Sequence, residues 1–168
     1  YALLMRFGRP LPEVLRARIM DPIGASDDWR WEGYSTSWIE MAGRRVQSVT
    51  GGGHWGGGLF IGADDHARFG QFICQNGQWN GAQILPEGWM QQALTPTPTL
   101  DKYGFLWWLN RGAEADPKLP ETAFSAQGAG GHTIWIAPKH DIVAVMRWLA
   151  PTATPHFLRQ LFAALADH

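Results

Sequence analysis

The clearest hydrophobic pattern lies in the last third of the chain. Residues 132–137 and 142–149 are two apolar runs, and Pro138-Lys139-His140-Asp141 separates them. This pattern predicts two antiparallel strands joined by a hairpin turn. Both runs are apolar on both faces, so we expect the sheet to be covered on both sides. Thr154-Pro155 then begins a predicted terminal helix, whose apolar side consists of Phe157, Leu158, Leu161, Phe162 and Leu165.

The rest of the chain alternates short helical patterns with loops rich in Gly, Pro and Trp. Helices are predicted at Leu11 to Met20, from Asp64 or Asp65 to about Cys74, and from Pro86 to about Leu94. Either aspartate can cap the second helix, and Asn76-Gly77 can end it. Strands are predicted at Trp29–Trp31, Arg45–Val49 and Tyr103–Leu109.

Composition narrows the class of protein. The 168 residues are 45% hydrophobic and 17% charged, which is typical of a globular domain. The formal net charge is −1, so nothing favours a nucleic acid or an anionic membrane as partner. No apolar run approaches the roughly 18 residues that span a bilayer. The single cysteine, Cys74, permits no intrachain disulfide and does not reveal the compartment.

Ten tryptophans and twenty glycines are unusual for this length. Six of the tryptophans flank Gly-rich or polar stretches: Trp29, Trp31, Trp38, Trp55, Trp107 and Trp108. Two interpretations stay open. The rings pack under loops, or they line a cleft for an apolar or ring-bearing substrate.

Four segments together resemble one family of enzymes. They are Leu11–Gly24, Gly57–Phe69 with its Gly-Gly-Leu and Asp-x-x-Arg-Phe motifs, Tyr103-Gly-Phe-Leu-Trp-Trp108, and Gly128–Val145. In this order they resemble the C-terminal part of penicillin-binding/β-lactamase-like serine hydrolases, the superfamily of class C β-lactamases, esterases and amide-oligomer hydrolases. The resemblance covers nearly the whole chain.

The resemblance implies an α+β fold. Its parts are a partial antiparallel sheet, a C-terminal helix packed on it, and part of a helical subdomain. Residues 1–168 would form the C-terminal part of one domain, with the helical and loop portion in 1–100 and the sheet strands and terminal helix in 101–168. The resemblance also implies that the enzyme cleaves a small-molecule ester, amide or β-lactam carbonyl through an acyl-enzyme. It further implies that no cofactor is needed and that the protein is periplasmic or secreted.

Such hydrolases carry three signatures: Ser-x-x-Lys, Tyr- or Ser-x-Asn, and Lys- or His-Thr-Gly. No serine in this chain has a lysine three positions later, and no tyrosine or serine has an asparagine two positions later. We therefore expect the catalytic serine, lysine and tyrosine upstream of Tyr1, and a chain that is inactive alone. The alternative is a non-catalytic binding module with the same fold.

The third signature is expected at Ala126-Gln127-Gly128, although no cation occupies its usual position. This departure favours an esterase or amidase over recognition of a β-lactam carboxylate. The candidate substrate-binding residues are Gln127, Gly128, Ala129, Gly130, Gly131 and His132, with His54 and Trp55 from a Gly-rich loop.

Each candidate has a structural alternative. The glycines either present backbone N–H groups to an oxyanion or form a bulge and a tight turn. His132 either reaches the substrate or makes a structural hydrogen bond, and His54-Trp55 either lines the cleft or anchors its loop. The histidines lack the close spacing of metal ligands, so no metal is expected.

One structural consequence of the resemblance concerns the sheet. Strands from an N-terminal segment would be missing, so the strand predicted at 142–149 should present an unpaired edge. We expect either the N-terminal remainder of the same protein or a second copy to cover it.

Overall fold

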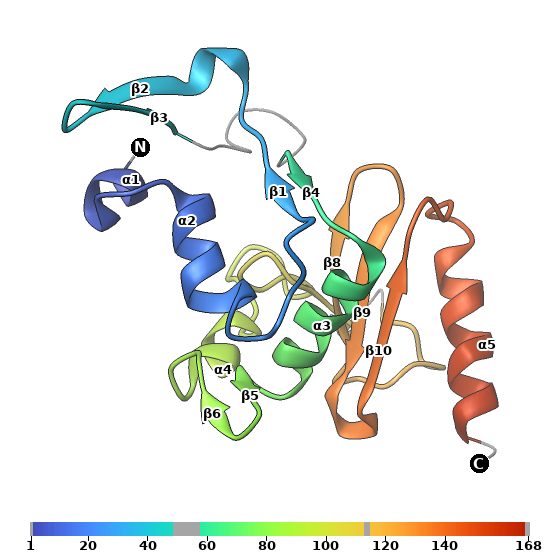
Figure 1. The fold of residues 1–168 in the computed structure, drawn as a ribbon. Coiled ribbons are helices and arrows are strands. Elements are labelled where there is room, and N and C mark those ends of the chain that lie inside the picture. The colour runs from blue at the N-terminus through green and yellow to red at the C-terminus, as the bar shows by residue number, and fades with distance from the viewer. Residues whose placement is uncertain (1, 49–57, 113–114, 167–168) are drawn as a thin grey trace. The chain divides into compact units, whose positions relative to one another are not determined.

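The computed structural model describes residues 2–48, 58–112 and 115–166 (Figure 1). The chain divides into two compact units, residues 1–69 and 70–168, and the division falls within helix α3 (Ala63–Cys74). Helices and antiparallel strands both occur, so the fold class is α+β, as predicted. None of the helices in the described ranges is long and apolar enough to cross a membrane.

The first unit contains short helices and two small sheets. Its elements are α1 (Ala2–Phe7), α2 (Leu11–Leu15), the π-helix η1 (Arg16–Met20), β1 (Arg30–Trp31), the 3-10 helix η2 (Ser35–Ser37), β2 (Trp38–Met41), β3 (Arg44–Gln47) and β4 (Leu59–Phe60). β1 pairs with β4, and β2 pairs with β3, both antiparallel. The helix predicted at residues 11–20 is confirmed, but its second half is a π-helix.

Neither Asp64 nor Asp65 caps α3, so the predicted start of this helix is wrong. The helix begins at Ala63, which places both aspartates inside the first turn. The buried carboxylate of Asp65 accepts hydrogen bonds from the backbone N–H and the hydroxyl of Ser26, at 3.0 and 2.6 Å, and from Arg68 at 2.9 Å. Burial acts to raise the pKa of Asp65, but these bonds outweigh it and the pKa is lowered. Asp65 thus ties the Ser26 loop to the helix.

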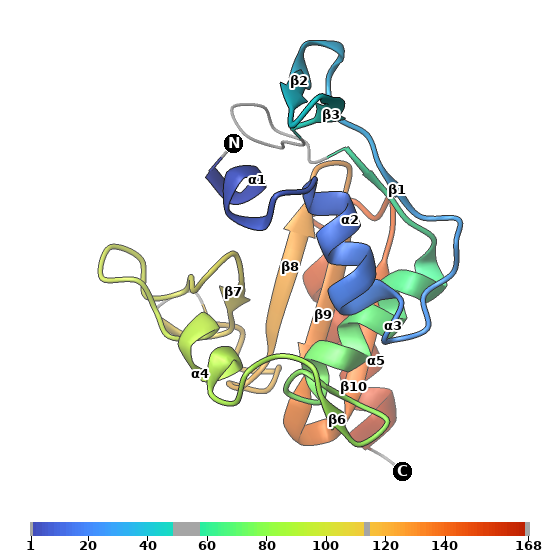
Figure 2. The same cartoon turned by 60° about the vertical axis from the view of Figure 1, so that its left-hand side comes forward.

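The second unit is built on a four-stranded antiparallel sheet (Figure 2). Its strands are β7 (Trp108–Leu109), β8 (Phe124–Gly128), β9 (His132–Ala137) and β10 (Ile142–Met146), in the order β10-β9-β8-β7. The remaining elements are the hairpin β5 (Gln78–Trp79) and β6 (Ala82–Gln83), helix α4 (Trp89–Ala93), the 3-10 turn η4 (Pro138–His140) and helix α5 (Thr154–Ala166). The predicted hairpin and terminal helix are confirmed.

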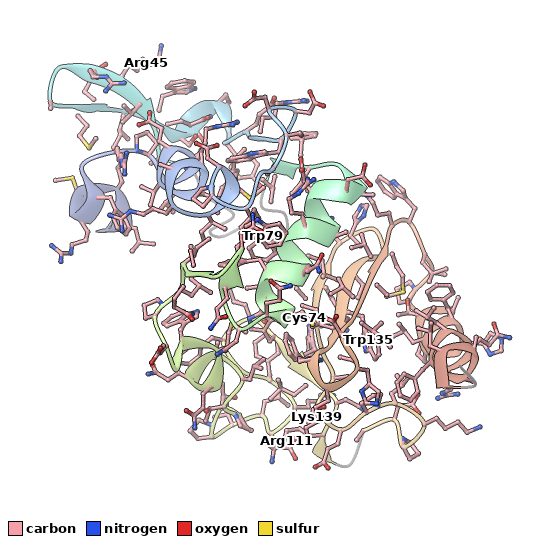
Figure 3. All side chains as sticks on the ribbon, turned by 60° about the horizontal axis from the view of Figure 1, so that its bottom comes forward. Arg45, Cys74, Trp79, Arg111, Trp135 and Lys139 are labelled. Atoms are coloured by element: carbon pink, nitrogen blue, oxygen red, sulfur yellow. The ribbon has the colours of Figure 1, made fainter. Side chains whose placement is uncertain are left out.

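Helices cover both faces of the sheet, as its apolar strands predicted (Figures 1 and 2). On one face, Trp135 packs with Leu158 of α5 in a buried cluster, and Figure 3 labels Trp135 on that side. On the other face lies the C-terminal half of α3. A Cβ on Gly70 would lie 2.6 Å from Val143 and 2.9 Å from Ile134. Glycine therefore lets α3 approach the sheet closely.

The segment predicted as a strand at Tyr103–Leu109 folds back on itself, so that prediction is wrong for most of its length. The N–H of Gly104 donates to the carbonyl of Trp107 at 2.9 Å, and Leu106 has a φ of 63°. The N–H of Phe105 donates to the carbonyl of Ala93 at the end of α4, at 2.7 Å. The backbone is thus held in a turn, and only Trp108–Leu109 joins the sheet.

Two further boundaries differ from the sequence prediction. β10 ends at Met146 and does not reach Leu149, because Trp148 turns the backbone with a φ of 59°. α4 begins at Trp89 and not at Pro86, because Gly88 adopts a left-handed conformation with a φ of 76°. Both breaks need a positive φ, which an apolar pattern does not reveal.

Candidate active site

The predicted substrate-binding residues of the second unit are contiguous in space. Gln127 and Gly128 end β8, and His132 begins β9. Gln127 pairs with Thr133, and Gly128 pairs with His132. The three residues between the strands form the turn of this hairpin, and its two last glycines have φ values of 83° and 73°. A tight turn with successive positive φ angles favours glycine, which adopts them without strain.

The side chains of Gln127 and His132 lie on opposite faces of the sheet. Successive residues of a strand alternate in direction, and Gln127 shares the face of its partner Thr133, which is the face toward α5. Its amide donates a 3.1 Å hydrogen bond to the buried hydroxyl of Ser125. Gln127, Thr133 and Thr154 line a cavity of about 280 Å³ there.

His132 lies on the face toward α3 and contacts an aromatic ring that the sequence did not indicate. Its imidazole packs edge-on against Trp148, with ring centroids 4.5 Å apart and an interplanar angle of 69°. A Cβ on Gly130 would lie 3.1 Å from the Trp148 ring, and a Cβ on Gly131 would lie 1.9 Å from the carbonyl oxygen of Leu149. The turn therefore sits directly against the segment that follows β10.

One side of the β8 terminus is open within the described part of the chain. β7 pairs only with Phe124 and Ser125, whereas β9 pairs with all five residues of β8. Ala126, Gln127 and Gly128 therefore have no strand partner on the side away from β9 among these residues. Strand residues direct N–H and C=O groups to both sides, so this edge offers backbone hydrogen bonds to a ligand.

The chemistry of the site is that of neutral donors. Residues 126–132 contain no charged side chain apart from the ionisable imidazole of His132. The available groups are the backbone N–H groups, the amide of Gln127 and the imidazole. These can orient a carbonyl and stabilise an oxyanion, but they include no activated nucleophile.

Two of the predicted residues lie outside the described part of the chain, and two other residues of the site were not predicted. His54 and Trp55 lie outside the described residues. Trp148 was missed because it continues an apolar run that reads as strand, and nothing in that run signals a left-handed residue. Ser125, which anchors Gln127, was also missed, although its position two residues earlier places it on the same strand face.

Comparison with known proteins gives partial matches. No family model matches the sequence. An uncharacterized protein of Alkalihalophilus pseudofirmus is 29% identical over 97 residues, which are 52% of this chain and 29% of that protein. A candidate 6-aminohexanoate-dimer hydrolase from Bacillus anthracis has a TM-score of 0.51 and 25% identity, over 66% of this chain and 30% of the other. A candidate β-lactamase from Bacteroides dorei has a TM-score of 0.51 and 18% identity, over 83% of this chain and 45% of the other.

These similarities support the β-lactamase-like resemblance at the level of fold. The first structural neighbour is a hydrolase by name, whereas the second shows the fold alone because its identity is low. The chain spans less than half the length of each of these three proteins. The activity of the whole protein is therefore a matter for proposal.

Proposed function

We propose that this chain supplies one wall of the active site of a serine hydrolase that cleaves an ester, amide or β-lactam carbonyl through an acyl-enzyme. The catalytic serine, lysine and tyrosine would come from residues outside this chain. The observation that carries the proposal is the open edge of β8 at Gln127–Gly128, next to a glycine turn. The likeness in fold to two hydrolases supports it.

The proposed role of this wall is to hold the carbonyl of the substrate. A backbone N–H at the open edge would donate to the oxygen that becomes negatively charged as the serine attacks. An ester or amide fits better than a β-lactam, because no cation lies among residues 126–132 to receive the carboxylate of a β-lactam.

The proposal is tested by labelling the longer protein with a fluorophosphonate and mapping the modified residue by mass spectrometry. We expect a labelled serine within an upstream Ser-x-x-Lys segment, and turnover of p-nitrophenyl butyrate. The chain of residues 1–168 should show neither. A Ser35→Ala variant of the longer protein serves as the control, because Ser35 is an exposed serine outside the candidate site and its removal should leave the label and the turnover unchanged.

Two outcomes would contradict the proposal. Robust turnover and covalent labelling of the 168-residue chain alone would place the nucleophile within it. A longer protein with no Ser-x-x-Lys segment and no turnover would instead identify a non-catalytic binding module with a β-lactamase-like fold.

A further inference from the structure

A small cavity lies at the end of β8, on the face of the sheet toward α5. Its volume is about 280 Å³, and it is found where the turn between β8 and β9 meets the start of α5 (Figure 1). Gln127 and Gly128 line it, and both belong to the stretch of β8 that has no strand partner on the side away from β9 in the described ranges. The cavity and the open edge therefore share two residues, so a ligand held at the edge can extend into the cavity.

Thr133 brings a buried hydroxyl to the wall of this cavity. The residue is only 8% exposed. The other buried polar residues of the described ranges are Asp65 and Ser125, and both form side-chain hydrogen bonds. The hydroxyl of Thr133 forms none with any residue of these ranges. A buried polar group without a partner costs free energy, so its presence calls for a bound water or a ligand.

The side chain of Gln127 lies beside this hydroxyl and faces the same cavity. Gln127 and Thr133 are cross-strand partners, and the Cβ atoms of such pairs lie about 4.5–5.5 Å apart. One N–H of the Gln127 amide donates to Ser125 at 3.1 Å, which fixes the side chain. Its carbonyl oxygen and second N–H stay available to a ligand. The cavity thus presents a donor and an acceptor from Gln127 next to the hydroxyl of Thr133.

The lining of the cavity favours an uncharged ligand group. Those described residues that line it are all uncharged, so an anion or a cation would enter without a counter-charge, which is costly away from water. The start of α5 does not supply donors for an anion either. The N–H of Thr154 donates to the carbonyl of Ala150 at 3.2 Å, and Pro155 has no N–H.

We propose that this cavity binds an uncharged amide group of the substrate, next to the scissile carbonyl at the open edge of β8. An amide both donates and accepts, so it can pair with Gln127 and satisfy the hydroxyl of Thr133 at the same time. This inference rests on the proposed function. It defines the substrate class as an ester or amide that carries a second, uncharged amide close to the scissile carbonyl.

The test measures binding of three probes of similar shape to the 168-residue chain by NMR. N-acetylglycinamide carries the second amide, N-acetylglycinate replaces it with a carboxylate, and N-isobutylacetamide replaces it with an apolar group. We expect saturable shifts at the Gln127 side-chain amide and at the backbone amides of Gly128 and Gly131 with N-acetylglycinamide. The other two probes should bind at least about threefold more weakly, because each lacks the paired donor and acceptor.

Variants at Thr133 connect this preference to the buried hydroxyl. Thr133→Val keeps the shape of the side chain and should weaken binding of N-acetylglycinamide by roughly three- to tenfold, the effect of one hydrogen bond. Thr133→Ser restores a hydroxyl and should restore binding. Thr99→Val, at an exposed threonine that does not line the cavity, is the matched control and should bind as the wild type does. The urea midpoint of Thr133→Val should not fall, because the hydroxyl that it removes has no partner.

Four results would overturn the inference. The absence of saturable shifts would mean that water alone occupies the cavity. Equal or tighter binding of N-acetylglycinate or N-isobutylacetamide would exclude an uncharged amide as the preferred group. Wild-type affinity in Thr133→Val would exclude the hydroxyl, and a lowered urea midpoint in that variant would show that the hydroxyl is already satisfied.

The outcome is separable from that of the hydrolase proposal, because binding of these probes requires no nucleophile. A labelled upstream serine without binding of N-acetylglycinamide would reject this inference alone. Binding of the probe in a protein that shows neither label nor turnover would reject the hydrolase and leave an amide-binding module.

Discussion

At the scale of single residues, Asp65 links two segments that are far apart in the sequence. The residue is 3% exposed, and its carboxylate accepts hydrogen bonds from both the backbone and the hydroxyl of Ser26, while Arg68 supplies a cation one turn along α3. A buried carboxylate is stable only when its oxygens are satisfied in this way. Removal of its charge should therefore affect the free energy of unfolding, and in a pH-dependent manner.

Asp65→Asn should lower the free energy of unfolding by about 1–3 kcal/mol at pH 7, because the hydrogen bonds that it loses involve a charged acceptor. The pKa of Asp65 is lowered by folding, so its contribution is present above the ordinary value of 3.8 and is lost as the pH falls below it. Urea unfolding at pH 7 and pH 3 measures this difference. The difference between the wild type and the variant should be smaller at pH 3 than at pH 7, and a constant difference would contradict the role of the charge.

Leu106 combines a strained backbone conformation with an exposed side chain. It has a φ of 63° and a side chain that is 79% exposed, so it gains little from burial. Leu106→Gly should raise the free energy of unfolding by about 0.5–1 kcal/mol, because glycine adopts a positive φ without strain. Leu100→Gly is the matched control, since Leu100 is exposed but has no positive φ, and it should destabilise. Thermal unfolding of both variants measures the contrast, and a Leu106→Gly variant less stable than wild type would exclude strain at this position.

At the scale of elements, the apolar pattern predicted correctly those strands and helices that are held in place by burial of their apolar side chains. β9 has the predicted bounds, and α5 begins at the predicted Thr154, because their apolar residues pack on one another. The segment 103–109 was misread because its apolar run is interrupted by backbone geometry at Leu106, and the carbonyl of Ala93, which holds Phe105, is distant in sequence. Likewise, the pattern located the turn at residues 129–131 but gave no indication of its contact with Trp148.

That turn allows a direct comparison of two glycines. Gly131 has a φ of 73° and a Cβ at this position would lie 1.9 Å from the carbonyl oxygen of Leu149, whereas a Cβ on Gly128 would lie 3.7 Å from its neighbour, an ordinary contact. Gly131→Ala should therefore lower the free energy of unfolding by more than about 2 kcal/mol, and Gly128→Ala should change it by less than about 0.5 kcal/mol. Urea titration measures both. Equal effects would contradict the close approach of the two backbones.

At the scale of the whole molecule, the outer edge of the second unit's sheet is the feature that bears on assembly. β10 is the last strand in the sheet order, and within the described ranges no strand pairs with its outer side. This agrees with the unpaired edge predicted from the sequence for the strand that begins at residue 142. On this side the backbone N–H and C=O groups of β10 face no strand of the described ranges, and they lie beside apolar side chains such as half-buried Val145, so the edge is a template for another strand.

We predict that the 168-residue chain self-associates through this edge, unless another segment of the same protein pairs with it. Val145→Lys should shift the chain toward monomer in multi-angle light scattering, because an inward-pointing charge at an edge opposes pairing with a second strand. Gln75→Lys adds the same charge at an exposed position after α3 and should leave the association unchanged. Thermal unfolding of both variants must show that they remain folded. A wild-type chain that is monomeric at all concentrations would mean that the edge of β10 does not recruit a second copy, and would leave pairing with the rest of the protein as the remaining explanation for its apolar surface.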